Sequence, residues 1–383
     1  MDFELTEEQK EMKNLARQFA EKEIAPIIEK DEAEHKFRPE IVKKMGDLGF
    51  FGGVIPEKYG GTETGFFSTL LMNEEIARVS ASYGLPFNMQ TIGPGTTILK
   101  WGTEEQKKEY LPKLVNAEMM SCFAITEPNS GSDVASMKSQ AEDKGDHYLL
   151  NGTKTWISNA QVADIGIVFA YTDRAKKHKG ISAFLVDIKK IKGITTRAIE
   201  TKLGLHCAPT GEIIFEDAKI PKSALLGKLG EGFKICMSML DNTRLSCACR
   251  AVGVAQAALD ASIKYSSERE QFGKKLNEFQ MIEEQIAEMY VDIQAARNLV
   301  YYAAYTKDKG QRNTLQVSTA KYFAAEVAVK ATNNAVKIFG SYGFSSEYPV
   351  ERFMRDAKSF QIVEGTSNIQ KMIIASYVLG KRK

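Results

Sequence analysis

Histidine and cysteine are scarce in this sequence of 383 residues, and neither is spaced as a metal site or a disulfide framework requires. The four histidines form no H-x-x-x-H or H-x-H pair, so we expect no metal site. The cysteines form no C-x-x-C pair and are odd in number, which is typical of free thiols in a reducing cytoplasm. The five are Cys122, Cys207, Cys236, Cys247 and Cys249.

Excess charge of one sign and long apolar runs are also missing. Lys and Arg total 51 and Asp and Glu total 49, which leaves a formal net charge of +2. This balance does not favour binding to nucleic acid. No stretch of 18 uncharged apolar residues occurs, and the acidic start of the chain is unlike a signal peptide. We therefore expect a soluble, cytoplasmic protein with no membrane segment.

Three common nucleotide-binding and hydrolase motifs are absent. The sequence contains no G-x-x-x-x-G-K-[ST] loop, no G-x-G-x-x-G after a strand and no G-x-S-x-G elbow. The absence of these motifs argues against a P-loop hydrolase, a Rossmann enzyme and an α/β-type serine hydrolase.

The distribution of apolar residues predicts a multidomain α and β protein. The chain is too long for one ordinary core, so several domains are expected. Residues 1–118 are predicted to form an N-terminal α-helical domain. Residues 119–226 are predicted to form a middle antiparallel β-barrel or sandwich, and residues 227–383 a C-terminal four-helix bundle.

Local patterns support these assignments. Asn151-Gly152 between two strand-like runs predicts a hairpin turn. From Ile282 to Val300, apolar residues repeat in steps of four and three, which predicts the core stripe of a long helix. Residues 79–99 contain no charged side chain, and glycines and prolines are expected to interrupt a single long helix there. This stretch is interpreted either as a buried connection or as an apolar pocket wall.

Five segments occur in a specific order along the chain. They are FAITEPNSGSD from Phe123, KTWISN from Lys154, REQFG from Arg269, FGSYG from Phe339 and EGTSNIQ from Glu364. Together they resemble the acyl-CoA dehydrogenase family over the whole length of the chain. The resemblance implies dehydrogenation of an acyl-CoA thioester, FAD as the cofactor, an electron-transfer flavoprotein as the electron acceptor and a homotetramer.

The resemblance also implies which residues bind FAD. A flavin is a flat apolar body edged with polar atoms, and a guanidinium suits its diphosphate. The expected flavin contacts in the middle domain are Phe123, Ile125, Thr126, Ser132, Trp156, Ile157 and Ser158. The residues expected to reach the cofactor of a neighbouring subunit are Arg269, Phe272, Gln280, Lys337, Ile338, Gly340 and Ser341. Thr366 and Asn368 complete the expected cofactor set.

Proton removal next to a thioester carbonyl needs a base in a dry site and donors for the developing oxyanion. By resemblance Glu364 is the catalytic base, and its backbone N–H helps to hold the thioester oxygen. Some relatives place the base on the helix that starts near Phe233, but Thr243 stands at that position here. The expected substrate contacts are Ser132, Asp241, Thr243, Arg244, Gly365, Thr91 and Val363.

The acyl group is predicted to be short, branched or alicyclic, with cyclohexanecarboxyl-CoA as one candidate. Val363 replaces the usual Tyr and leaves a wider space. A dicarboxylic acyl chain would need a cation at the pocket end. The basic residues that bound the uncharged stretch are Arg78 and Lys100, and relatives that act on glutaryl-CoA carry an Arg near the position of Gly84.

Three alternatives stay open at this point. The first is a glutaryl-CoA dehydrogenase, and the second is a flavin oxidase or monooxygenase on the same fold. A reduced flavin that persists in the presence of oxygen would indicate a dehydrogenase, and a rapidly reoxidised one an oxidase or monooxygenase. The third, a non-enzymatic helical interaction protein, would purify without a flavin spectrum.

Overall fold

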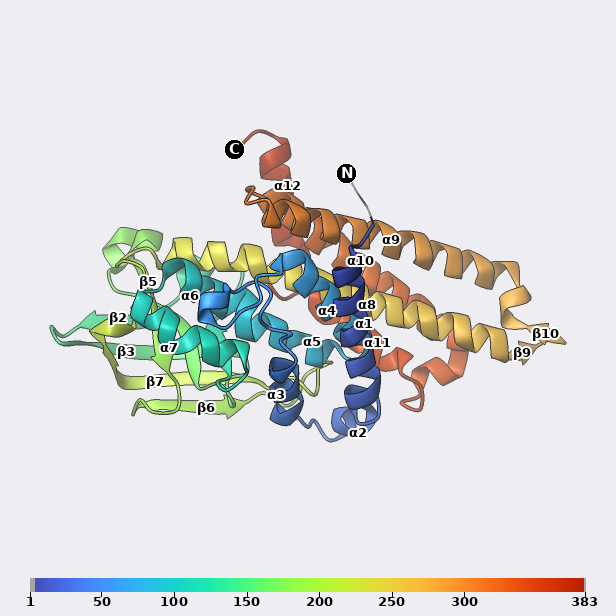
Figure 1. Cartoon of the computed structure of the whole chain (residues 1–383), viewed down its shortest axis with the longest axis horizontal. Coiled ribbons are helices and arrows are strands. Elements are labelled where there is room, and N and C mark those ends of the chain that lie inside the picture. Colours follow the sequence, from blue (N-terminus) through green and yellow to red (C-terminus); the bar gives the residue numbers. More distant parts are fainter. Residues whose placement is uncertain (1–3, 382–383) are drawn as a thin grey trace.

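The chain folds into a helical part, a β part and a second helical part, which confirms the predicted order. The computed structural model describes residues 4–381. Figure 1 shows the sheet at one end of the long axis and the β9–β10 hairpin at the other end. In that described part of the chain, no helix is long and apolar enough to cross a membrane.

The N-terminal part consists of short helices. Thr6 caps the first of them in a capping box with Gln9. The elements are α1 (Glu7–Phe19), η1 (Ala20–Ile24), α2 (Ile28–Ala33), α3 (Pro39–Asp47), η2 (Glu57–Tyr59), α4 (Gly65–Val79), α5 (Ala81–Phe87), η3 (Asn88–Gly95), α6 (Thr96–Trp101) and α7 (Glu104–Val115).

The uncharged stretch is helical almost throughout, but not as one regular α-helix, because a π-helical segment separates α5 from α6. Helix α5, the π-helical segment η3 and helix α6 follow one another directly, and every residue from 80 to 95 is buried. Pro94 supplies no backbone donor, but the hydroxyls of Thr96 and Thr97 bond to the carbonyls of Ile92 (2.6 Å) and Gly93 (2.7 Å). These side chains satisfy backbone acceptors in the irregular segment.

The middle part is one eight-stranded sheet that does not close into a barrel. Its order is β6-β7-β3-β2-β4-β5-β8, with β1 paired to β4. The β1–β4 and β2–β4 pairs are parallel and the other pairs are antiparallel. The strands are β1 (Ser121–Ala124), β2 (Gln140–Asp143), β3 (His147–Ser158), β4 (Ile165–Tyr171), β5 (Ile181–Asp187), β6 (Ile194–Ala198), β7 (Thr210–Pro221) and β8 (Leu225–Leu226).

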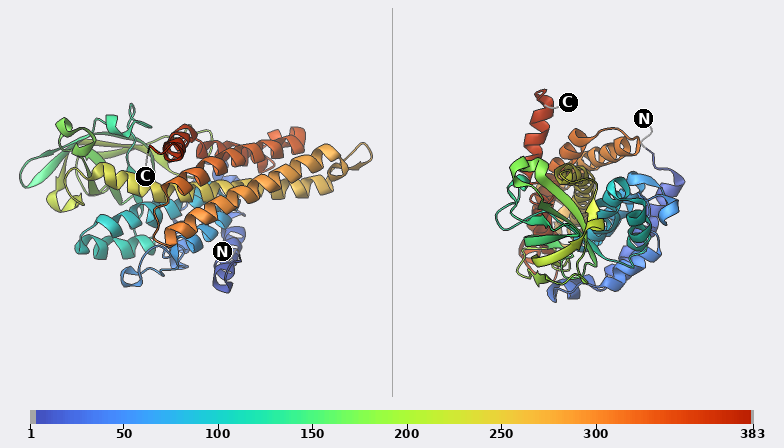
Figure 2. Two further views of the ribbon diagram at one scale, coloured as in Figure 1. Left: turned by 90° about the horizontal axis from the view of Figure 1, so that it is seen from above. Right: turned by 90° about the vertical axis from the view of Figure 1, so that its left-hand side faces the viewer.

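Strand β4 explains how this sheet is covered. Its seven residues are all buried. Ile165, Ile167 and Phe169 pack with side chains of α6, α7 and α8, whereas Val168 and Ala170 share a second core with side chains of β3, β5 and β7. The sheet therefore has one face against helices (Figure 2), and its other buried side chains form a core of their own. Three short helical turns connect its strands, at η4 (Val134–Ser136), η5 (Arg174–Gly180) and η6 (Lys222–Ala224).

The predicted hairpin at Asn151-Gly152 is wrong, because β3 continues through both residues. Asn151 pairs with Gln140, and the register against β7 shifts between Leu150 and Gly152. Gly152 has φ 139°, and a Cβ there would lie 2.3 Å from Oγ of Ser139. Glycine thus serves a β-bulge and a close approach instead of a turn.

The C-terminal part is built from long helices around α8. Met289, Ile293, Ala296 and Val300 of the predicted stripe are buried, and α8 contacts α4, α9, α10 and α11. The elements are α8 (Gly232–Glu268), β9 (Glu270–Gln271), β10 (Lys274–Lys275), η7 (Leu276–Glu278), α9 (Gln280–Asp308), α10 (Thr314–Phe339), η8 (Gly340–Phe344), α11 (Val350–Phe360) and α12 (Ser367–Val378).

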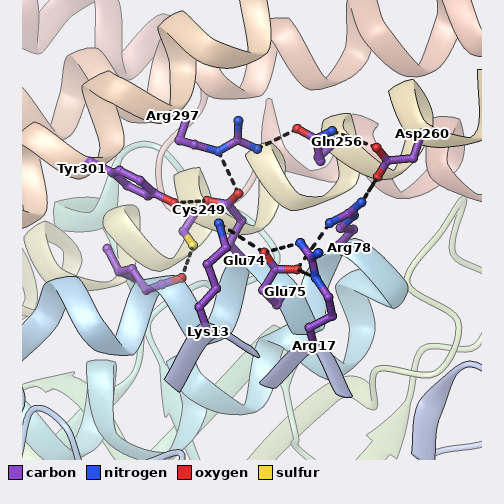
Figure 3. Close-up of polar contacts among 11 residues, drawn as sticks. Lys13, Arg17, Glu74, Glu75, Arg78, Cys249, Gln256, Asp260, Arg297 and Tyr301 are labelled. Atoms are coloured by element: carbon purple, nitrogen blue, oxygen red, sulfur yellow. Dashed lines mark hydrogen bonds and ion pairs between the residues drawn. The ribbon is translucent and has the colours of Figure 1, made fainter. Parts of the chain in front are cut away.

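Two adjacent buried acids on α4 join the helical parts (Figure 3). Glu74 accepts from Nε of Arg297 (2.9 Å) and from the hydroxyl of Tyr301 (3.1 Å), both on α9. Glu75 accepts from Nε of Arg17 on α1 at 2.9 Å and lies 3.5 Å from a guanidinium nitrogen of Arg78. The two carboxylates thus each have their own cations, and they tie α4 to the helices on both sides.

Candidate active site

Glu364 lies at a sharp backbone elbow between α11 and α12. The φ angles of Glu364 and Gly365 are 58° and 84°, both in the left-handed region. The carbonyl of Glu364 accepts from Nε of Arg244 (3.1 Å), and that of Gly365 accepts from Nζ of Lys321 (2.7 Å). Gln370 donates to both carbonyls. These bonds hold a non-glycine residue in a strained conformation, which is common at functional sites.

The carboxylate of Glu364 accepts hydrogen bonds from two neutral donors in distant parts of the chain. Nδ2 of Asn88 lies 3.0 Å from Oε1, and Oγ1 of Thr243 lies 2.6 Å from Oε2. Asn88 begins η3 and Thr243 lies on α8. The carboxylate is therefore oriented without a cation bonded to it.

The predicted substrate residues on α8 gather around the same elbow. Arg244 is buried, and one of its terminal nitrogens lies 2.9 Å from Oδ1 of Asp241. The other oxygen of Asp241 accepts from the hydroxyl of Thr314 at 2.9 Å. Thr91 is fully buried near Asn88, and its hydroxyl has no partner in the described structure. Val363 precedes the elbow and is 37% exposed.

Two residues at this elbow were missed by sequence reasoning. Asn88 lies in the uncharged stretch, where an amide gave no distinctive signal. Lys321 is a lone cation on the buried, alanine-rich face of α10, and that unusual placement was the available signal. Burial lowers the pKa of Lys321, while the nearby Cys247 and Glu364 act against this effect.

The residues predicted to contact the flavin ring come together at β1 and β3. Trp156 has φ 59° beside a register shift in β3, and its side chain is 58% exposed. The neighbouring N–H of Thr155 bonds to the carbonyl of Thr126 at 2.9 Å. Ile157 is buried and Ser158 is half-buried. Phe123 lies on β1 and Ile125 directly follows it, whereas Ser132 is exposed in the loop beyond.

A buried ion pair supports this arrangement from behind. Nζ of Lys154 lies 2.8 Å from Oε1 of Glu127 and 3.2 Å from the carbonyl of Ile125. Oε1 of Glu127 also accepts from the N–H of Ser139 at 2.9 Å. These bonds fix the loop after β1 against β3, which places the Thr126 backbone next to Thr155, the neighbour of Trp156.

The flavin set adjoins the Glu364 set through Gly93 of η3. A Cβ on Gly93 would lie 3.1 Å from Cγ2 of Thr243 and 3.3 Å from Cε1 of Phe123. Thr243 contacts the carboxylate of Glu364, and Phe123 belongs to the flavin set. The absence of a side chain at Gly93 thus lets these two groups of residues approach each other.

The remaining predicted cofactor residues lie elsewhere within one chain. Arg269, Phe272, Gln280, Lys337, Gly340 and Ser341 are exposed, and Ile338 is buried. They lie at the β9–β10 end, opposite the sheet (Figure 1). The guanidinium of Arg269 stacks 5.6 Å from the ring centroid of Tyr342, and the side chain of Phe272 is 94% exposed. Thr366 and Asn368 instead lie at the elbow, where the Thr366 hydroxyl caps α12.

Comparison with protein families accounts for nearly the whole chain. Residues 6–118 match the model of the acyl-CoA dehydrogenase N-terminal domain, residues 122–218 the middle domain and residues 230–379 the C-terminal domain. The chain belongs to the acyl-CoA dehydrogenase family. It is therefore an FAD-dependent oxidoreductase, as the resemblance predicts.

Known acyl-CoA dehydrogenase relatives are similar over their full length. A glutaryl-CoA dehydrogenase of Desulfococcus multivorans is 50% identical over 387 residues, covering 100% of this chain and 99% of the relative. A solved glutaryl-coenzyme A dehydrogenase in complex with glutaryl-CoA has a TM-score of 0.98 and 50% identity, covering 100% of this chain and 98% of that one. A subunit of the caffeyl-CoA reductase–Etf complex of Acetobacterium woodii is 42% identical, and the match covers 98% of this chain and 99% of the relative.

The surface around Trp156 fits the isoalloxazine of FAD. A large indole left 58% exposed in a strained backbone conformation offers a flat apolar wall. Thr126 and Ser158 are close to Trp156 along or across the strands and are only half-buried, so their hydroxyls are available as donors to the polar ring edge. The residues present thus match the chemistry of the family's cofactor.

Proposed function

We propose that this chain catalyses α,β-dehydrogenation of an acyl-CoA thioester, with Glu364 as the base. The carboxylate takes the proton from the α-carbon, the β-carbon loses a hydride, and a carbon–carbon double bond forms between them. Held against Trp156, Thr126 and Ser158, FAD would supply the acceptor for that hydride. The observation that carries the proposal is that Asn88 and Thr243 orient the Glu364 carboxylate, and that Thr243 approaches Phe123 of the flavin set across Gly93.

The elbow also supplies a donor for the thioester oxygen. The N–H of Glu364 has no hydrogen-bond partner among the described residues. Proton loss from the α-carbon builds negative charge on the carbonyl oxygen, and an unused backbone N–H is suited to stabilise it. We assign this role to Glu364 N, and close passage of the substrate to Gly365.

We propose that a neighbouring subunit completes the binding site for the diphosphate-containing half of FAD. Arg269, Phe272, Gln280 and residues 337–341 lie at the opposite end from Trp156, so a second chain is required to bring them to the same FAD. This supports an assembly of at least two chains, and the family resemblance makes a homotetramer the proposed form. An electron-transfer flavoprotein is the proposed electron acceptor, in line with the relative named for an Etf complex.

Two acyl groups are candidates. Val363, with its exposed side chain, favours a wide pocket and a short, branched or alicyclic acyl group such as cyclohexanecarboxyl. The 50% identity to glutaryl-CoA dehydrogenase favours a glutaryl group instead, and the comparisons support this second candidate better than the first.

Substitution of the base tests the reaction. Glu364→Gln keeps the shape of the side chain but removes its basicity, so anaerobic flavin reduction by an acyl-CoA should fall by about 10²–10⁴-fold. Flavin content and acyl-CoA binding should stay unchanged, and the exposed Glu347→Gln serves as the matched control. Single-turnover reduction at the wild-type rate in Glu364→Gln would refute the assignment.

A further inference from the structure

Arg250 on α8 is a buried cation without a bonded partner. It is 1% exposed, and its Nε has no hydrogen-bond partner. In the described part of the chain, the guanidinium takes part in no ion pair, and its one aromatic contact is with Phe360, 5.7 Å from the ring centroid. Burial of a guanidinium without an anion is costly, so its retention calls for an explanation.

The nearby acids of α4 do not serve Arg250. Glu74 is bonded to Arg297, and Glu75 is bonded to Arg17 (Figure 3). Asp260, further along α8, pairs with Nε of Arg78 at 2.7 Å. The charge of Arg250 is therefore left for a group that the protein itself does not supply.

Residues on two neighbouring helical segments show where Arg250 lies relative to the base Glu364. On α8, Thr243 contacts Glu364 and Arg250 follows two turns later, which places both on one face about 10 Å apart. On the opposite wall, Asn88 contacts Glu364 and Gly84 precedes it by one turn. Along the contact of α5 and η3 with α8, Glu364 thus lies at the Asn88–Thr243 end and Arg250 at the Gly84 end.

The absence of a side chain at Gly84 makes room for the aliphatic part of Arg250. A Cβ at Gly84 would lie 2.9 Å from Cδ of Arg250 and 3.0 Å from Oδ1 of Asn73. That Asn73 oxygen is itself buried and unbonded. Side chains on a helix lean toward its N-terminus, so Arg250 leans toward Thr243 and the base.

We propose that Arg250 binds a terminal carboxylate of the acyl group, so that the substrate is a dicarboxylic acyl-CoA of about glutaryl length. A guanidinium can hold a carboxylate through two parallel hydrogen bonds and neutralise its charge. The leaning arginine and a five-carbon diacid chain together span the interval from Glu364. The proposal rests on the proposed dehydrogenation and decides between its two acyl candidates.

This assignment corrects the expectation that only Arg78 and Lys100 could meet a second carboxylate. Arg78 is engaged with Asp260, and Lys100 donates to Ser238 at 3.1 Å. The cation comes from α8, more than 150 residues after the uncharged stretch, and sequence neighbours could not indicate it.

The test compares glutaryl-CoA with pentanoyl-CoA, which has the same length and no terminal charge. Arg250→Met should lower kcat/KM for anaerobic flavin reduction by glutaryl-CoA by about 10–100-fold, the range of a charge-assisted hydrogen bond, and leave or improve pentanoyl-CoA. Arg250→Lys should restore part of the glutaryl activity. Lys100→Met is the matched control and should leave the ratio between the two thioesters unchanged.

A second measurement needs no substitution and covers the case in which the variants do not fold. In the unchanged protein, the neutral amide analogue 4-carbamoylbutyryl-CoA should bind at least about 10-fold more weakly than glutaryl-CoA. Equal affinity for the two, or an equal loss on both thioesters in Arg250→Met, would overturn the role of Arg250. If no acyl-CoA reduces the flavin, the proposed dehydrogenation itself fails.

Discussion

The hydroxyl of Thr243 lies 2.6 Å from Oε2 of Glu364, although the two residues are 121 positions apart in the chain. This contact joins the middle of α8 to the elbow before α12, and Asn88 makes the matching contact from η3. The geometry assigns Thr243 as a positioning residue for the proposed base.

Loss of the Thr243 hydroxyl should therefore slow the reaction without abolishing it. Thr243→Val keeps the shape and removes the donor, so flavin reduction should fall by about 10–100-fold, as expected for one hydrogen bond to a charged group. KM should change little, because the hydroxyl contacts Glu364. Thr243→Ser should restore most of the rate, and a Val variant with wild-type kcat would contradict the role.

Arg269 is predicted to retain FAD from a neighbouring subunit. Arg269→Ala removes a charge-assisted partner for the diphosphate, which is worth about 1.5–3 kcal/mol, so FAD should be lost on gel filtration. The exposed Lys264→Ala on α8 is the control and should keep its cofactor. Unchanged flavin content in Arg269→Ala would remove Arg269 from the site.

Asp356 is predicted to make stability depend on pH between about 4 and 7. Burial and the nearby Glu32 raise the pKa of Asp356 from 3.8 to about 7. The native state therefore keeps a proton that the unfolded chain has lost in this window, so stability falls as pH rises through it.

Asp356→Asn should remove this dependence. Its oxygen can still accept from the N–H of Leu205, so the variant should be more stable than the parent at pH 8 by on the order of 1–3 kcal/mol. Urea unfolding at pH 5 and 8 measures the effect. The exposed Asp47→Asn is the control, and parallel pH profiles of parent and Asp356→Asn would contradict the prediction.

Glu75 is predicted to stabilise the junction of α1 and α4 above acid pH. Burial acts to raise its pKa, but the bond from Arg17 and the charges of Lys13 and Arg78 outweigh this, so the pKa is lowered. Stability from Glu75 is thus present above the unfolded pKa and is lost as pH falls through the folded value.

Glu75→Gln should destabilise the protein by about 1–3 kcal/mol at pH 7, because Lys13, Arg17 and Arg78 would no longer have the Glu75 carboxylate as an ion-pair partner. The difference from the parent should shrink in acid. Glu11→Gln, on the exposed face of α1, should have little effect. A Glu75→Gln protein as stable as the parent would show that the network in Figure 3 adds no net stability.

Local patterns were sufficient for features that depend on neighbours in the chain. The helical stripe that includes Met289, Ile293 and Val300 follows from periodicity alone, since one face of a helix must be buried. The same pattern logic failed at Asn151-Gly152, because a glycine with positive φ serves a bulge as well as a turn. Which of the two forms depends on the strands that pair there.

The sequence by itself determined the order of helical, β and helical parts, the family and Glu364 as the candidate base, because these are carried by periodicity and by contiguous motifs. Only the tertiary structure decided that Asn88, Thr243 and Lys321 meet at the elbow, and that Arg250 faces Gly84 without an anion. The reason is physical. Hydrogen bonds and desolvation act over a few ångströms in space, and helix packing brings together residues that are far apart in the chain.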